Sequence, residues 1–254
     1  MSWASQRRFF ILLIVGAIAA AFCVVVLIPT LYKTPSCTDG IQNQDEAGID
    51  CGGSCAYLCT AEVQPPIVLF TKVLQNAEGR TDVIALVENK NADVAAKDVP
   101  YRIALYGEGH SFVQEINGTV DLPPRTTKPI YLPGVVSGGK PIVQAFLEIS
   151  PSAPQWFTLT ADPRIVPKVS HTTFVGTESN PRVEAVLTNS SGVPLTNVQA
   201  IVLVYDTNKN VIAASGTVLP VISAQGQSTA TFTWNIAFAG IPASAEVVPI
   251  IPLP

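Results

Sequence analysis

The chain has 254 residues, of which 48% are hydrophobic and 13% are charged, and its formal net charge is -4 at pH 7. A chain of this length and apolar content can bury a core in one or two domains, which excludes a disordered protein. It lacks the large basic field of nucleic-acid binders, so we expect no nucleic-acid partner. It has only two histidines, His110 and His171, which excludes most imidazole-based catalytic and metal sites.

An uncharged apolar run lies near the start of the chain. Residues 9–28 follow Arg7 and Arg8 and end before Pro29. Twenty residues in a helix span about 30 Å, the thickness of the hydrocarbon core of a bilayer. Basic residues favour the cytoplasmic side, so we expect a cytoplasmic tail at 1–8, one transmembrane helix, and an extracytoplasmic C-terminal bulk. A cleaved signal peptide is the weaker interpretation, because its apolar region is only about 7 to 15 residues long.

Four of the five cysteines lie close together after this run, in residues 29–60, which we interpret as a linker and a cysteine-rich segment. They are Cys37, Cys51, Cys55 and Cys59. An even set of cysteines outside the cytoplasm indicates two disulfides, and three pairings are possible. Zinc on four thiolates is a disfavoured alternative, because the spacing differs from paired zinc knuckles and the compartment is oxidising.

The same segment offers oxygen ligands that suit a calcium ion. The candidate ligands are Asp39, Asn43, Asp45, Glu46 and Asp50. Hard cations prefer such oxygens, although the spacing is not that of an EF-hand loop. Calcium therefore remains open beside a plain disulfide knot, and we expect no other cofactor. The pattern C-x-D-G-x-x-N-x-x-E-x-x-x-D-C-G-G-x-C-x-x-C, from Cys37 to Cys59, resembles a short cysteine motif of bacterial surface and secreted proteins. This resemblance implies an extracytoplasmic module.

The rest of the chain contains a pattern that occurs twice, about 100 residues apart. The matching stretches are 83–89 with 183–189, 99–106 with 198–205, and 118–120 with 216–218. Each copy has short runs rich in Val, Ile, Thr and aromatic residues, separated by turn residues, which is typical of antiparallel sandwiches. We therefore expect an all-β fold with two tandem immunoglobulin-like β-sandwiches, at 61–160 and 161–254.

Two stretches carry clear strand patterns. In residues 229–236, Ala230, Phe232, Trp234 and Ile236 alternate with polar residues, which predicts a strand with one buried face. Residues 200–205 are apolar throughout, which predicts a central strand whose second face is partly covered.

The stretches Ile103–Gly107 (IALYG) and Val202–Asp206 (VLVYD) resemble the FxLYD-type domain, a bacterial immunoglobulin-like module. Val or Ile replaces the leading Phe in both, and Gly107 replaces the Asp in the first. The resemblance implies a sandwich fold with an extracytoplasmic binding or spacer role, and it brings no catalytic residue with it.

Charge is sparse at the end of the chain, where the 72 residues from Val183 onward contain only four charged ones. A fully solvated domain usually carries more, so we expect a protein or envelope partner there. The sequence thus favours a membrane-anchored extracytoplasmic structural or protein-interaction module of the cell envelope, without catalysis. A ligand-sensing ectodomain of a larger membrane complex is the alternative, and a hydrolase is a weaker third.

Overall fold

The structure is a computed structural model that describes residues 3–31, 36–77, 79–136, 140–150 and 154–254. The chain forms two compact units, Met1–Cys55 and Ala56–Pro254, which are described one at a time. Part of the predicted linker, residues 32–35, lies outside the described residues.

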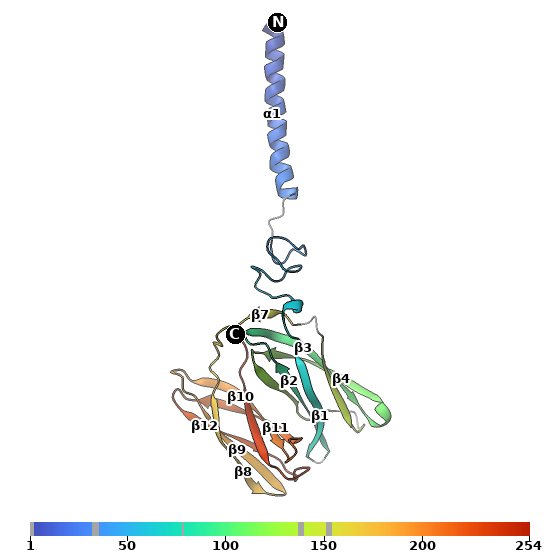
Figure 1. The fold of residues 1–254 in the computed structure, drawn as a ribbon, viewed down its shortest axis with the longest axis vertical. Helices are drawn as coiled ribbons and strands as arrows, with labels where there is room; N and C mark the ends of the chain where they lie inside the picture. The colour runs from blue at the N-terminus through green and yellow to red at the C-terminus, as the bar shows by residue number, and fades with distance from the viewer. Residues whose placement is uncertain (1–2, 32–35, 78, 137–139, 151–153) are drawn as a thin grey trace. The chain divides into compact units, whose positions relative to one another are not determined.

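The first unit begins with the helix α1, Trp3–Leu31, which contains the whole predicted apolar run (Figure 1). Its window Gln6–Val26 has a mean hydropathy of 3.1, and none of it is buried within the chain. By length and composition the helix can cross a bilayer once, a property that membrane anchors share with signal sequences.

The cysteine-rich segment contains the two predicted disulfides. Cys37 is bonded to Cys55, with their Cα atoms 5.7 Å apart, and Cys51 and Cys59 are also disulfide-bonded, whereas Cys23 in α1 is free. The sequence left the pairing open, and the structure decides it. Between the cysteines the backbone forms turns, such as the bridge between Gly48 and Cys51, with little regular structure.

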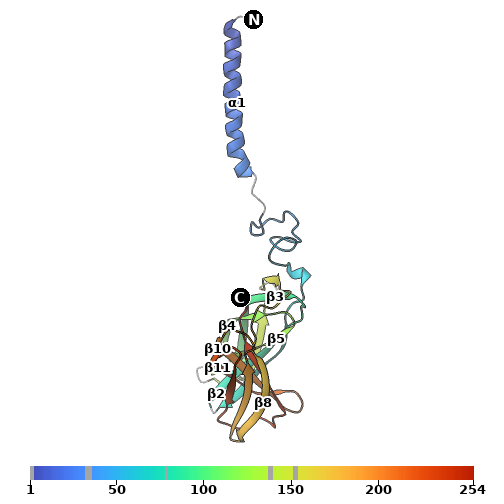
Figure 2. The ribbon, with the colours of Figure 1, turned by 90° about the vertical axis from the view of Figure 1, so that its left-hand side faces the viewer.

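The second unit contains two β-sandwiches with the same strand order, as predicted. In the first, sheet β1–β2–β5 faces sheet β4–β3–β6, and β7 also pairs with β3; in the second, β8–β9–β12 faces β11–β10–β13. All these pairings are antiparallel. Figure 1 shows the two sandwiches beside each other, and Figure 2 views the second one nearer the reader.

The bounds of the strands are β1 Ile67–Ala77, β2 Arg80–Asn89, β3 Val94–Tyr106, β4 Phe112–Leu122, β5 Thr126–Leu132, β6 Gln144–Ile149, β7 Trp156–Thr158, β8 Lys168–Thr177, β9 Asn180–Thr188, β10 Leu195–Tyr205, β11 Val211–Ile222, β12 Gln227–Thr233 and β13 Ser244–Ile250. Short 3₁₀ helices span Thr60–Glu62 (η1) and Glu108–His110 (η2).

The structure confirms both predicted strands, although the strand predicted at 229–236 is shorter than expected. Ala230, Phe232 and Trp234 are buried as predicted, but β12 ends at Thr233, so Trp234 and Ile236 lie in the loop that follows. The pairing ends there because Pro181 on β9 accepts a hydrogen bond from the Trp234 amide but has no N–H to donate in return. β10, which contains residues 200–205, is the central strand of its sheet, as expected.

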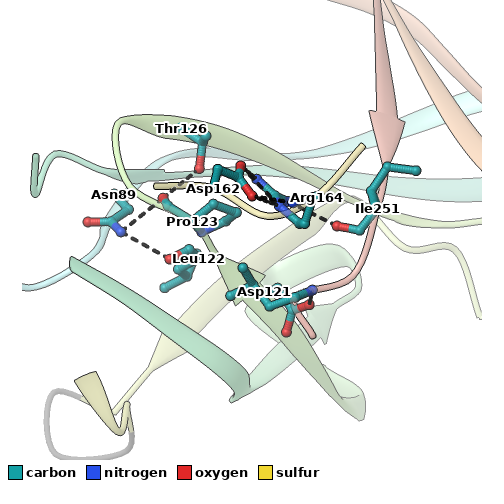
Figure 3. Close-up of polar contacts among 9 residues, drawn as sticks. Asn89, Asp121, Leu122, Pro123, Thr126, Asp162, Arg164 and Ile251 are labelled. Atoms are coloured by element: carbon teal, nitrogen blue, oxygen red, sulfur yellow. Dashed lines mark hydrogen bonds and ion pairs between the residues drawn. The ribbon is translucent and has the colours of Figure 1, made fainter. Parts of the chain in front are cut away.

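A buried asparagine closes one corner of the first sandwich. The Asn89 Nδ2 donates to the carbonyl oxygens of Val94, Leu122 and Pro123 at 2.8 to 3.0 Å, and two of these bonds are drawn in Figure 3. Its Oδ1 accepts from the Asn91 amide at 3.0 Å. One side chain thus satisfies backbone groups of three segments that would otherwise be buried without partners.

The second sandwich has the same corner 100 residues later. The Asn189 Nδ2 donates to the carbonyls of Val193, Ile222 and Ser223, and its Oδ1 accepts from the Ser191 amide. Both asparagine side chains are buried. The matched stretches 83–89 and 183–189 therefore end on residues with the same structural role.

Three hydrophobic cores are present in this unit, one inside each sandwich and a third between them. The third core joins the outer face of sheet β1–β2–β5 to the outer face of sheet β11–β10–β13. Its buried members are Leu74, Ile84, Ile201, Leu203, Val211 and Ala214. Part of the low charge after Val183 thus has an intramolecular cause, because one face of β10 is covered by the first sandwich.

Polar contacts reinforce this junction. The Lys72 Nζ donates to the Val211 carbonyl at 2.6 Å, and the Leu253 amide donates to Asp121 at 2.6 Å. Arg164, in the connection between the sandwiches, pairs with Asp162 and donates to the Ile251 carbonyl, as Figure 3 shows. The two sandwiches are therefore joined by both apolar and polar contacts.

Candidate ligand-binding cleft

A cleft of about 460 Å³ opens at the junction of the two sandwiches. The first sandwich contributes residues from the β1–β2 hairpin and β5, and the second contributes the start of β9, part of β11 and the end of β12. The volume is within the range of small-ligand sites, which often form at domain junctions. We take this cleft as the candidate site.

The floor of the cleft is built around the buried carboxylate of Asp82. It accepts hydrogen bonds from the Asn76 Nδ2 (2.6 Å), the Arg80 Nε (2.8 Å), the Tyr131 hydroxyl (2.5 Å) and the Gly134 amide (2.6 Å). The Asn76 Nδ2 also donates to the carbonyl of Ala214 at 2.7 Å, which connects this network to the second sandwich. This hydrogen-bond network therefore holds residues of both sandwiches in place around the cleft.

These contacts determine the charge state of the floor. Burial would raise the pKa of Asp82, but the hydrogen bonds from Tyr131, Arg80, Gly134 and Asn76 outweigh burial and hold it below its ordinary value. Burial and the contact with Asp82 both raise the pKa of Tyr131. Asp82 is therefore an ionised structural acceptor whose oxygens already hold four donors, and not a free general base.

The rim of the cleft is rich in hydrogen-bond donors. The side chains of Arg80 and Arg182 are 47% and 50% exposed, and Arg182 makes only a long contact of 3.5 Å with Glu184. Trp234 also lines the cleft; it is 6% exposed, and its buried Nε1 has no hydrogen-bond partner among the described residues. The rim therefore suits an anionic or acceptor-rich ligand.

An apolar groove of about 510 Å³ adjoins the cleft and shares Pro181 and Arg182 with it. Here the core of the second sandwich opens to the surface. The ring of Phe238 packs edge-on against Trp234 and Phe174, with centroids 5.0 and 6.3 Å apart. A polar cleft and an apolar groove thus lie next to each other at one end of the second sandwich.

The predicted calcium ligands are held by other contacts. Asp50 accepts from the amides of Asp39 and Gly40, Glu46 from those of Asn43 and Asp50, and Asp45 from the Ser54 hydroxyl. Within the described part of the chain, no donor reaches the Oδ1 of the half-buried Asn43.

Among the described residues, only Cys37, Glu46 and Cys55 form a group of three potential ligands within 4.8 Å, and both of these cysteines are in a disulfide. Asp39, Asp45 and Asp50 do not converge in that way. Calcium binding stays a prediction.

The two histidines lie apart from the cleft. The His110 Nδ1 contacts Gln144, and the His171 Nδ1 contacts Ser170. The cleft could not be predicted from the sequence, because its residues come from distant strands. One sequence signal was present, namely Asp82 immediately before the apolar run of β2, because a carboxylate at the end of a buried strand needs donors nearby.

Sequence comparisons match the chain to no protein family and to no curated protein. Among solved structures, red sea bream transglutaminase aligns with 15% identity and a TM-score of 0.25, over 74% of this chain and 29% of that one. A glycoside hydrolase family 2 β-glucuronidase aligns with 10% identity and a TM-score of 0.23, over 82% and 26%.

The exo-chitosanase CsxA of Amycolatopsis orientalis aligns with 11% identity and a TM-score of 0.19, over 70% of this chain and 26% of that one. The chain spans less than a third of the length of each of these enzymes. At such scores the alignments carry no argument about activity.

Proposed function

We propose that the chain is a membrane-anchored, extracytoplasmic interaction module of the cell envelope that acts without catalysis. In this proposal its two sandwiches are copies of one FxLYD-like domain and work as a single rigid unit. The observation that carries the proposal is the third hydrophobic core, which joins the two sandwiches that follow the apolar helix in the chain.

A rigid junction suits binding better than a flexible one. Ile84, Ile201 and Leu203 are almost fully buried at this junction, so separating the sandwiches would expose them to water. Surfaces contributed by both sandwiches are then held in one arrangement, and a partner does not have to order them on binding.

The cleft favours a second candidate, a ligand-sensing ectodomain. Its walls come from both sandwiches, so a ligand held there would touch both.

The topology can be tested with single engineered cysteines in the full-length chain in intact cells. In a Cys23→Ser background, we expect a membrane-impermeant maleimide to label Ser190→Cys, at an exposed position, without permeabilisation. Ser2→Cys should be labelled only after permeabilisation. The reverse pattern would contradict the proposed orientation.

Carbonate extraction of the same membranes tests the anchor. The full-length chain should stay in the membrane pellet, because transfer of 20 apolar residues to water is unfavourable. Release of a shorter soluble chain would show that residues 9–28 are a cleaved signal peptide.

A further inference from the structure

We propose that the cleft and the adjoining groove together bind the carboxyl-terminal end of a peptide. The terminal carboxylate lies between Arg80 and Arg182, and the last apolar side chain enters the groove beside Phe174 and Phe238. This inference rests on the proposed binding role of the chain but does not depend on its membrane topology.

Charge is the first argument. Asp82 is the only acidic residue that lines the cleft in the described part of the chain, and its carboxylate is already held by four donors. Arg80 uses its Nε for Asp82, and its Nη2 lies a long 3.5 Å from the Tyr131 hydroxyl. The outer nitrogens of Arg80 therefore remain to bind a carboxylate, as does the guanidinium of Arg182 apart from its long 3.5 Å contact with Glu184. Guanidinium groups bind carboxylates through paired hydrogen bonds.

The lining of the groove favours the carboxyl-terminal end of a peptide over a sugar acid as the ligand. It is lined mostly by apolar residues, among them Phe174, Phe238 and Ile241, which suit an aliphatic or aromatic side chain better than a row of hydroxyl groups. Because the groove and the cleft share Arg182, a ligand in both must combine an anionic group with an apolar group close to it.

Strand β8 supplies the backbone contacts that a peptide needs. It is an edge strand of the sheet β12–β9–β8, and the described residues place no strand on its other side. Its last residues, from Phe174 onward, line the groove. An extended peptide can therefore pair with this edge, as in other cases of strand addition.

The test uses the full-length chain in detergent and three acetylated pentapeptides, Gly-Ser-Gly-Ser-Xaa with Xaa as Ala, Leu or Phe. Each is prepared as the free acid and as the amide, and binding is followed by the change in tryptophan fluorescence. We expect saturable binding of the Leu or Phe acid. The matching amide should bind at least tenfold more weakly, because it has no charge for the two arginines.

Two variants provide the matched comparison. Arg182→Gln should weaken binding of the acid at least tenfold, whereas Arg102→Gln, which removes a similarly exposed arginine outside the cleft, should leave it unchanged. Trp234→Phe should lose most of the fluorescence change, because Trp3 and Trp156 do not line the cleft.

Equal binding of acid and amide, an unchanged affinity in Arg182→Gln, or no saturable binding of any peptide at millimolar concentration would overturn the proposal. Glucuronate binding as tightly as the peptides would overturn the peptide assignment. None of these results would bear on the orientation of the chain in the membrane, which the cysteine labelling tests separately.

Discussion

The two sandwiches share their interiors but differ on their outer faces. Both have the same strand order, and both close a corner with a buried asparagine, Asn89 or Asn189. Their inward-facing residues on β2 and β9 also correspond, with apolar side chains in each core. The fold therefore constrains the interior strongly and leaves the outer faces free to diverge.

On the sheets that contain β2 and β9, the outer faces have opposite character. Ile84 lies in the third core, whereas its counterpart Glu184 is half-buried and contacts Arg182. Tyr131 packs against the third core, whereas its counterpart Thr231 is exposed. The first sandwich has the apolar face here, and the second has the polar one.

On the opposite sheets the difference is reversed. Arg102 on β3 pairs with Glu115 and Glu148, whereas its counterpart on β10, Ile201, is buried in the third core together with Leu203. The two apolar faces meet and the two polar faces remain outside. The contact joins different faces of two similar domains. If every outer face were apolar, such contacts could continue from one copy of the domain to the next, and the polar outer faces prevent this.

The largest expected effect comes from charging the contact between the sandwiches. Leu203 is fully buried and lies opposite Glu246 on the neighbouring strand. Leu203→Glu places an unpaired charge in the third core, so we expect a loss of more than about 4 kcal/mol in unfolding free energy, or a single transition that splits into two. Denaturant unfolding of the detergent-solubilised chain measures both.

Ala104→Glu is the matched control. Ala104 is the counterpart of Leu203 on β3, and it also faces a glutamate, Glu115, across the strand pair. Because this face is partly open to solvent, we expect a loss of less than about 1 kcal/mol. Similar losses in the two variants would show that the contact between the sandwiches contributes little.

A smaller loss of stability, similar in the two sandwiches, is expected from replacing the buried asparagine that closes a corner of each. Asn89→Ala and Asn189→Ala each remove three hydrogen bonds from the side chain to backbone carbonyls, which costs about 2 to 3 kcal/mol in each sandwich. The two values should agree within about 1 kcal/mol. Thermal unfolding of the single variants checks this, and a large loss in only one of them would contradict a common role.

The smallest effect concerns Lys128, which is buried where the C-terminal residues meet the first sandwich. Burial, and then the nearby charge of Arg164, lowers the pKa of Lys128 to about 8. The unfolded chain then holds more protons than the folded chain between about pH 8 and pH 10, so stability should rise across that window. We expect a gain of about 2 kcal/mol or less.

Lys128→Met should lose this rise, and the measurement is the difference in unfolding free energy between the two chains at pH 7.5 and 9.5. Taking the difference cancels the tyrosines, whose raised pKa values act in the opposite direction at higher pH. A constant difference across this window would contradict the assignment.

Much of the fold could be predicted from local patterns. The apolar run gave the helix, the alternation at Ala230 and Phe232 gave a one-sided strand, and the uniformly apolar run at 200–205 indicated a strand covered on both sides. These patterns depend on spacing along one segment, which the sequence displays directly.

The segments that cover the second face of β10 could not be predicted. Ile201 and Leu203 contact Leu74 and Ile84, which lie more than 100 residues earlier, whereas the low charge of this region had suggested a contact with another protein. The cleft was missed for the same reason, because Arg80 and Arg182 come together only after both sandwiches fold and dock. A single sequence shows no such long-range pairs.

The most direct test of the rigid junction is the distance between two spin labels, on Thr119→Cys in β4 and Thr231→Cys in β12, in a Cys23→Ser background. Both positions are exposed and lie on different sandwiches. Pulsed electron paramagnetic resonance on the detergent-solubilised chain should give one narrow distance distribution, which broadens when Leu203→Glu is added. A distribution that is already broad without that substitution would contradict a fixed junction.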